Sequence, residues 1–175
     1  ASVVADAATV IAEGFDEADR RDPHHTRTWV ALVDGNAHQI DRIRAEADAR
    51  GVAVTIVADF VHVIEYVWRA AWCFYPEGDP TAEVWVREQG LRILDGRSGA
   101  AAAAIRRKAT YAGLTPTQRG AADTAADYLT RLRPHLGYAT ALAHGWPIAT
   151  GVIEGACRHL VKDRTDITGA RWSLD

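Results

Sequence analysis

The sequence of 175 residues contains no methionine, only two cysteines and only two lysines. Cys73 and Cys157 are far apart in apolar stretches, which excludes a disulfide-rich scaffold and predicts two reduced core thiols. The formal net charge of −3 excludes binding of nucleic acid by the whole surface, although a local basic patch remains compatible with it. No apolar run is long enough to span a bilayer, so we expect no membrane partner and a cytoplasmic location.

The scarcity of lysine beside many arginines, together with abundant alanine, indicates a GC-rich bacterial genome. Because methionine is missing even at position 1, we expect the chain to be part of a longer reading frame.

The first third of the sequence has a strand–helix–strand pattern. The apolar runs 28–34 and 52–58 predict buried strands, and residues 37–50 predict a polar-faced helix that Gly51 ends. Such a unit implies parallel strands with a right-handed crossover. An amphipathic helix over residues 2–20 precedes it.

The remainder predicts helices almost throughout, so the fold class is α/β but helix-dominated. The expected helices cover residues 60–74, 81–94, 100–112, about 115–133 and 152–164. Thr115 and Pro116 read as the N-cap and first residue of the fourth of these. Two parallel strands are not a stable sheet by themselves, so either further strands are missing or helices carry the core. If strands are missing, the edge of the 28–34 strand should be unpaired or paired with another molecule.

Three acidic positions are candidates for chemistry. Asp34 and Asp59 each follow a predicted strand, so both should lie at the carboxyl edge of the sheet, where carboxylates can hold Mg²⁺ or Mn²⁺. The alternative is an Asp-Gly turn at Asp34 and a helix N-cap at Asp59. Glu154 stands between Gly151 and Gly155 on a predicted helix, which suggests close approach of a backbone or ligand.

His62 and Glu65 follow Asp59 at helical spacing. A zinc site is disfavoured because the pattern lacks the second histidine of metallopeptidase helices. We expect His62 to bond a neighbouring carboxylate or backbone group.

Three segments together resemble a known family: VDGNAHQI, VADFVHVIEYVW and GWPIATGVIEGACRHLVKDRTDITGARW. They are similar to the DDE transposases of bacterial insertion sequences, most closely the ISKra-type and more distantly the ISL-type and Mutator-like families. The resemblance covers residues from about 1 to 173, and its last motif is the most specific. It implies a partial RNase H-like core over 1–61, a helical insertion over 62–145 and a C-terminal core helix within 146–175.

By this resemblance Asp34 matches the second catalytic Asp and Glu154 the catalytic Glu, both as metal ligands. Asp59 and His62 match the family's C/D-x-x-H motif beside the site, and Asp59 could also ligate metal. The first catalytic Asp would lie upstream of Ala1. A rival alignment makes Asp34 the first Asp and Asp59 the second, but the RNase H strand order requires a hairpin between them.

The function implied is cleavage and joining of DNA at insertion-sequence ends by two-metal phosphoryl transfer with Mg²⁺ or Mn²⁺. It also implies a nucleoid-associated homo-oligomer on DNA. A basic cluster suited to DNA phosphates consists of Arg158, Lys162, Arg164 and Arg171. One alternative is a truncated, inactive helical module that binds DNA or protein. Another is a small hydrolase with Zn²⁺ at Asp59 and His62.

Overall fold

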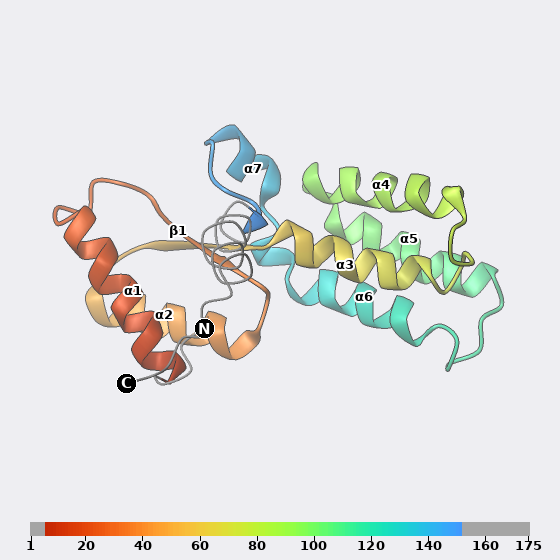
Figure 1. The fold of residues 1–175 in the computed structure, drawn as a ribbon, viewed down its shortest axis with the longest axis horizontal. Coiled ribbons are helices and arrows are strands. Elements are labelled where there is room, and N and C mark those ends of the chain that lie inside the picture. The colour runs from red at the N-terminus through yellow and green to blue at the C-terminus, as the bar shows by residue number, and fades with distance from the viewer. Residues whose placement is uncertain (1–5, 152–175) are drawn as a thin grey trace, which may run out of the picture.

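The computed structural model describes residues 6–151, and within this range the chain is a helix-dominated α/β structure with two parallel strands (Figure 1). The helix of residues 152–164 expected from the sequence lies outside the described residues. The elements, in order, are α1 (Ala7–Arg21), β1 (Trp29–Val33), α2 (Ala37–Arg50), β2 (Val54–Ala58), α3 (Phe60–Ala71), α4 (Pro80–Leu94), α5 (Ser98–Tyr111), α6 (Gly120–Arg131), η1 (Arg133–His135) and α7 (Tyr138–Ala143).

The strand–helix–strand prediction is confirmed. β1 and β2 pair in parallel, from Trp29 opposite Val54 to Val33 opposite Ala58, and α2 connects them. The side chain of Asn36 caps the first turn of α2, while Gly51 ends the helix in the left-handed conformation (φ 66°) that glycine adopts without steric cost.

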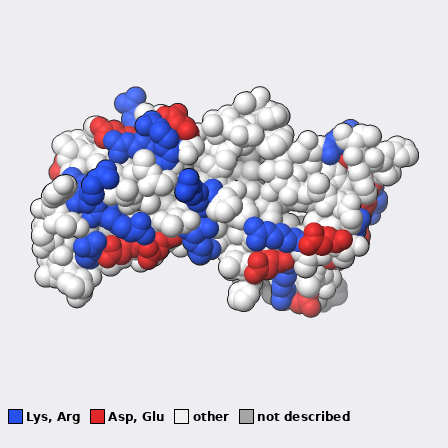
Figure 2. All heavy atoms as spheres, turned by 180° about the vertical axis from the view of Figure 1, so that it is seen from behind, with Lys and Arg blue, Asp and Glu red and all other residues white. Residues whose placement is uncertain are grey.

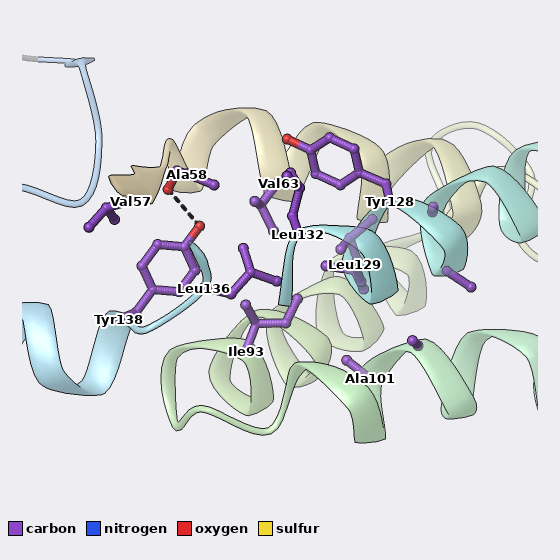
Figure 3. Close-up of a cluster of buried hydrophobic side chains, with 14 of the residues drawn as sticks. Val57, Ala58, Val63, Ile93, Ala101, Tyr128, Leu129, Leu132, Leu136 and Tyr138 are labelled. Carbon is purple, nitrogen blue, oxygen red and sulfur yellow. Dashed lines mark hydrogen bonds between the residues drawn. The ribbon is translucent and has the colours of Figure 1, made fainter. Parts of the chain in front are cut away.

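Helices carry most of the core among the described residues. In Figure 1, α3 to α6 form a four-helix bundle in which each helix packs against two others. Several of the side chains buried between α5 and α6 are alanines, and these small residues let the helix axes approach closely. Larger side chains fill the centre of the cluster in Figure 3, among them Val63, Ile93, Leu129 and Leu132.

The sheet meets the helical half at its carboxyl edge. Tyr138 at the start of α7 is fully buried, and its hydroxyl donates a 2.8 Å hydrogen bond to the carbonyl oxygen of Ala58, the last residue of β2 (Figure 3). Burial raises the pKa of Tyr138, so this hydroxyl remains a donor. His135 in η1 lies 3.2 Å from the carbonyl oxygen of Ile56 on the same strand.

The outer edge of β1 is free within residues 6–151, where β2 is its sole partner. Four of its five residues, Trp29 to Leu32, are only half-buried although all are apolar. A largely apolar cleft of about 600 Å³ lies between β1 and α1, with Ile11 and Phe15 among its walls. The strand edge that the sequence led us to expect is therefore present in the structure.

One predicted boundary is wrong. The sixth helix begins at Gly120 and not at Thr115, although Thr115 and Gln118 exchange hydrogen bonds: the side-chain oxygen of Gln118 accepts the backbone N–H of Thr115, and the Thr115 hydroxyl accepts the backbone N–H of Gln118. These are the contacts of a capping box, so Thr115 caps a turn as predicted, but this turn is separate from α6. In the part of the chain that the structure describes, no helix has the length and apolar character of a membrane span.

Candidate functional site

The carboxyl edge of the sheet brings Asp34 and Asp59 to neighbouring positions. They directly follow Val33 and Ala58, which face each other in the parallel pair. The backbone N–H of Asp59 extends this pairing by donating a 2.7 Å bond to the carbonyl of Val33. The sequence-based placement of both residues at one edge is therefore confirmed, although their side chains have different surroundings.

The carboxylate of Asp59 is buried, with 1% of the residue exposed. Its Oδ1 accepts the backbone N–H of Val61 at 2.7 Å and so caps α3. Its Oδ2 accepts both the backbone N–H of Thr150, at 2.9 Å, and the Thr150 hydroxyl. A second bond, from the N–H of Phe60 to the carbonyl of Ile148 at 2.8 Å, holds the two segments together. We call these contacts the Asp59–Thr150 clamp.

Burial is the strongest influence on the ionisation of Asp59 and opposes it. The hydrogen bonds from Thr150 and Val61 outweigh burial, so the pKa of Asp59 lies below its usual value and the group stays ionised at neutral pH. Because hydrogen-bond donors of the protein engage both oxygens, the Asp59 carboxylate is not suited to coordinate a metal ion in the observed geometry. It acts as a helix cap and as an anchor for the segment at Thr150.

His62 lies beside the clamp without joining it. Its Nδ1 is 3.9 Å from Oδ2 of Asp59, too far for a hydrogen bond, and this buried atom has no partner among the described residues. The bond that we expected His62 to make is therefore not formed through Nδ1. The observed geometry does not support zinc binding at Asp59 and His62, and no cluster of three or more potential metal ligands occurs between residues 6 and 151.

Asp34 is exposed at the edge of a cleft of about 460 Å³. Its Oδ1 accepts the backbone N–H of Asn36 at 2.8 Å, which closes the turn into α2 as the Asp-Gly interpretation predicts. Its Oδ2 accepts no hydrogen bond from any described residue, and Asp34 is among the residues that line the cleft. Asp34 therefore fits a ligand of Mg²⁺ or Mn²⁺, which prefer oxygen donors.

Helix α6 holds the turn at Asp34 in place, although it lies more than ninety residues later in the sequence. The hydroxyl of Tyr128 donates to the carbonyl of Asp34 at 2.8 Å, and the guanidinium of Arg131 donates to the carbonyl of Gly35 at 3.0 Å. Burial raises the pKa of Tyr128 to about 12, so the hydroxyl remains protonated. Gly35 has φ 91° and lies against Leu132 and Tyr128, so the close packing and the backbone both require glycine.

Sequence reasoning did not find Tyr128 or Arg131. Both stand on an ordinary amphipathic helix, where a tyrosine and an arginine three residues apart give no signal of a site. Asp34, His62 and Glu65, which the sequence singled out for other reasons, all line this cleft.

The other predicted functional residues, Glu154, Arg158, Lys162, Arg164 and Arg171, lie outside the described residues.

Comparison with known proteins adds no further assignment. The chain matches no family model, no curated protein and no solved structure.

Proposed function

We propose that this chain is part of a DNA-cleaving and DNA-joining catalytic core of the DDE transposase type, with Asp34 and Glu154 as acidic residues of the site. The observation that carries the proposal is the Asp59–Thr150 clamp. It fastens Thr150 to the same carboxyl edge of the sheet at which Asp34 lies. Glu154 follows Thr150 by four residues, and a polypeptide of that length spans at most about 14 Å.

The clamp gives a physical reason for two carboxylates 120 positions apart to share one edge. Asp34 follows β1, and Thr150 is fixed at the end of the adjacent β2. A bridge between a strand end and a remote segment is expected where a fold assembles a site from distant parts of its chain. Asp59 then has a positioning role, because it holds the segment that leads to Glu154.

Asp34 and Glu154 would hold Mg²⁺ or Mn²⁺, which supplies the charge stabilisation that phosphoryl transfer requires. The chain's own part is to position these carboxylates and exclude competing contacts. Tyr128 and Arg131 hold the backbone of the turn at Asp34, whose Oδ1 is bound to Asn36 and whose Oδ2 has no partner among the described residues. This proposal also implies an RNase H-like core with a helical insertion.

The distribution of charge supports DNA as the substrate class. Acidic residues outnumber basic ones in residues 6–59, whereas basic residues outnumber acidic ones in residues 60–145. Figure 2 shows Lys and Arg side chains spread over the face of the helical half, on the left in this view. The small positive balance of residues 60–145 favours phosphates, whereas the negative balance of residues 6–59 opposes them.

The test measures nicking of supercoiled DNA with Mg²⁺ for the wild type and for Asp34→Asn and Glu154→Gln. Each substitution should abolish metal-dependent nicking, whereas Asp41→Asn, an exposed acid on α2, should leave it unchanged. Binding of Mn²⁺, followed by electron paramagnetic resonance, should weaken in the first two variants and not in the third. If nicking and Mn²⁺ binding are insensitive to Asp34 and Glu154, the catalytic proposal is wrong.

A second candidate function is a helical DNA-binding module without catalysis. The basic surface of the helical half favours it, and it requires no metal. DNA binding that is unaffected by chelation, together with no nicking by any variant, would select it over the first proposal.

A further inference from the structure

The cleft beside Asp34 has a second wall, and its part on α3 has no role in the proposed chemistry. One face of α3 contributes His62, Glu65, Tyr66 and Arg69, which are spaced at i, i+3, i+4 and i+7 and therefore point to the same side. Arg131 of α6 completes this wall. Two arginines from different helices thus line one cleft, next to a carboxylate that fits a divalent cation.

Aromatic rings hold the two guanidinium groups in place. The rings of Tyr66 and Tyr128 are stacked, with centroids 3.9 Å apart and planes 10° from parallel. The Arg69 guanidinium lies 4.9 Å from the Tyr66 centroid, and that of Arg131 lies 5.6 Å from the Tyr128 centroid. Cation–π contacts restrict these long side chains, so less conformational entropy is lost when they bind a ligand.

Neither arginine is committed to a strong ion pair. Arg131 donates from Nη1 to the carbonyl of Gly35 and pairs with no carboxylate among residues 6–151, which leaves most of its N–H groups available. Arg69 approaches Glu65 only at 4.0 Å, and both side chains are more than half exposed, so this pair is weak. Guanidinium groups with open N–H positions bind phosphate oxygens well.

We infer that this cleft binds the phosphodiester backbone of a DNA strand through Arg131 and Arg69, next to the metal-binding position at Asp34. The volume of about 460 Å³ suits a nucleotide-sized group. Asp34 and Glu65 offset the charge of the two arginines, so a small free anion gains little here. A strand gains more, because it brings further phosphates to the basic helical half. The inference rests on the proposed function for its choice of DNA.

The test is fluorescence anisotropy with a labelled single-stranded oligonucleotide in Ca²⁺, so that binding is measured without cleavage. Arg131→Gln and Arg69→Gln should each weaken binding about tenfold and reduce the slope of log K against log salt by about 0.7, the value for one phosphate contact to a single strand. Arg20→Gln is the matched control, because Arg20 is an exposed arginine on α1, away from the cleft. It should bind as the wild type does.

Further variants separate folding from binding. Arg131→Lys keeps the charge, so it should keep the salt slope and lose part of the affinity, and circular dichroism establishes that each variant is folded. If Arg131→Gln does not fold, Arg69→Gln and Arg131→Lys carry the test. Wild-type affinity and slope in both folded glutamine variants would overturn the inference, even where Mg²⁺-dependent nicking upholds the proposed function.

Two other outcomes distinguish the sources of phosphate and the two proposals. If thymidine monophosphate competes as strongly as the oligonucleotide, the cleft takes a free nucleotide and the strand assignment is wrong. If the arginine variants lose binding while no variant shows metal-dependent nicking, the cleft is a nucleic-acid site and the catalytic proposal fails alone.

Discussion

Replacement of Asp59 by asparagine tests the clamp between the sheet edge and the segment before Gly151. The aspartate accepts three hydrogen bonds through two oxygens and is almost fully buried. Asparagine offers one carbonyl oxygen, so it can cap α3 or receive Thr150 but cannot do both. In either orientation an NH₂ group meets a backbone N–H donor.

The magnitude follows from the bonds that are lost. A hydrogen bond to a charged group contributes about 1.5–3 kcal/mol, and a buried donor without a partner costs a further ~1–3 kcal/mol. Allowing for relaxation of the segment at Thr150, we expect Asp59→Asn to lower the free energy of unfolding by about 2–4 kcal/mol. This is a large share of the total stability of about 5–15 kcal/mol that is typical of a domain.

The assay is urea denaturation followed by circular dichroism, with two variants of the partner residue. Thr150→Ser keeps the hydroxyl and should stay within about 0.5 kcal/mol of the wild type, whereas Thr150→Val should cost about 1–2 kcal/mol. The double variant Asp59→Asn/Thr150→Val should cost less than the sum of the single changes, because the two residues share one contact. A loss below about 0.5 kcal/mol for Asp59→Asn, or strict additivity, would refute the clamp.

The same contact predicts a pH dependence with a definite sign. The pKa of Asp59 is lowered in the folded protein, so the unfolded chain takes up the proton first as the pH falls. The contribution of this group is fully present above the unfolded pKa of about 4 and decreases as the pH falls through the lower folded pKa. Wild type should therefore lose more stability than Asp59→Asn over this acidic range, and equal losses would contradict the assignment.

Three further substitutions probe other contacts. Gly35→Ala should destabilise the fold by about 2 kcal/mol or more, because the new Cβ would lie against Leu132 and the backbone conformation favours glycine. A thermal unfolding midpoint equal to that of the wild type would contradict this. Tyr138→Phe should cost about 1–2 kcal/mol in urea denaturation by removing the bond to Ala58, and no loss would show that the bond is dispensable. Val30→Lys on the free strand edge should reduce any self-association seen by light scattering, and unchanged association would place the contact elsewhere.

The local structure could largely be predicted from the sequence. Continuous apolar runs and the residues that begin and end α2 identified the two strands and the helix between them, because these signals act within a few positions. The N-cap role of Asp59 could be predicted for the same reason. The start of α6 could not, because the turn that Thr115 and Gln118 cap is separate from the helix that begins at Gly120.

The assembly of the site could be predicted only in part. Parallel pairing placed Asp34 and Asp59 at one edge, since the register of a strand pair fixes which residues follow side by side. The bond from Asp59 to Thr150 and the support of Asp34 by Tyr128 join residues more than ninety positions apart. Neither bond is encoded in local periodicity, because each depends on how the helical half packs against the sheet.

These remote contacts also determine the order in which the chain can fold. The four-helix bundle of α3 to α6 lies within residues 60–131, so even its longest closure, between α3 and α6, is shorter than those of the remote bonds, and we expect it to assemble earlier. The bonds from Tyr128 to Asp34, from Tyr138 to Ala58 and from Thr150 to Asp59 close loops of 94, 80 and 91 residues. The strands are synthesised before the helices, yet the bond between Asp59 and Thr150 can form only after residues near position 150 have been made. We therefore expect the site to be completed last, after the helices that support it have packed.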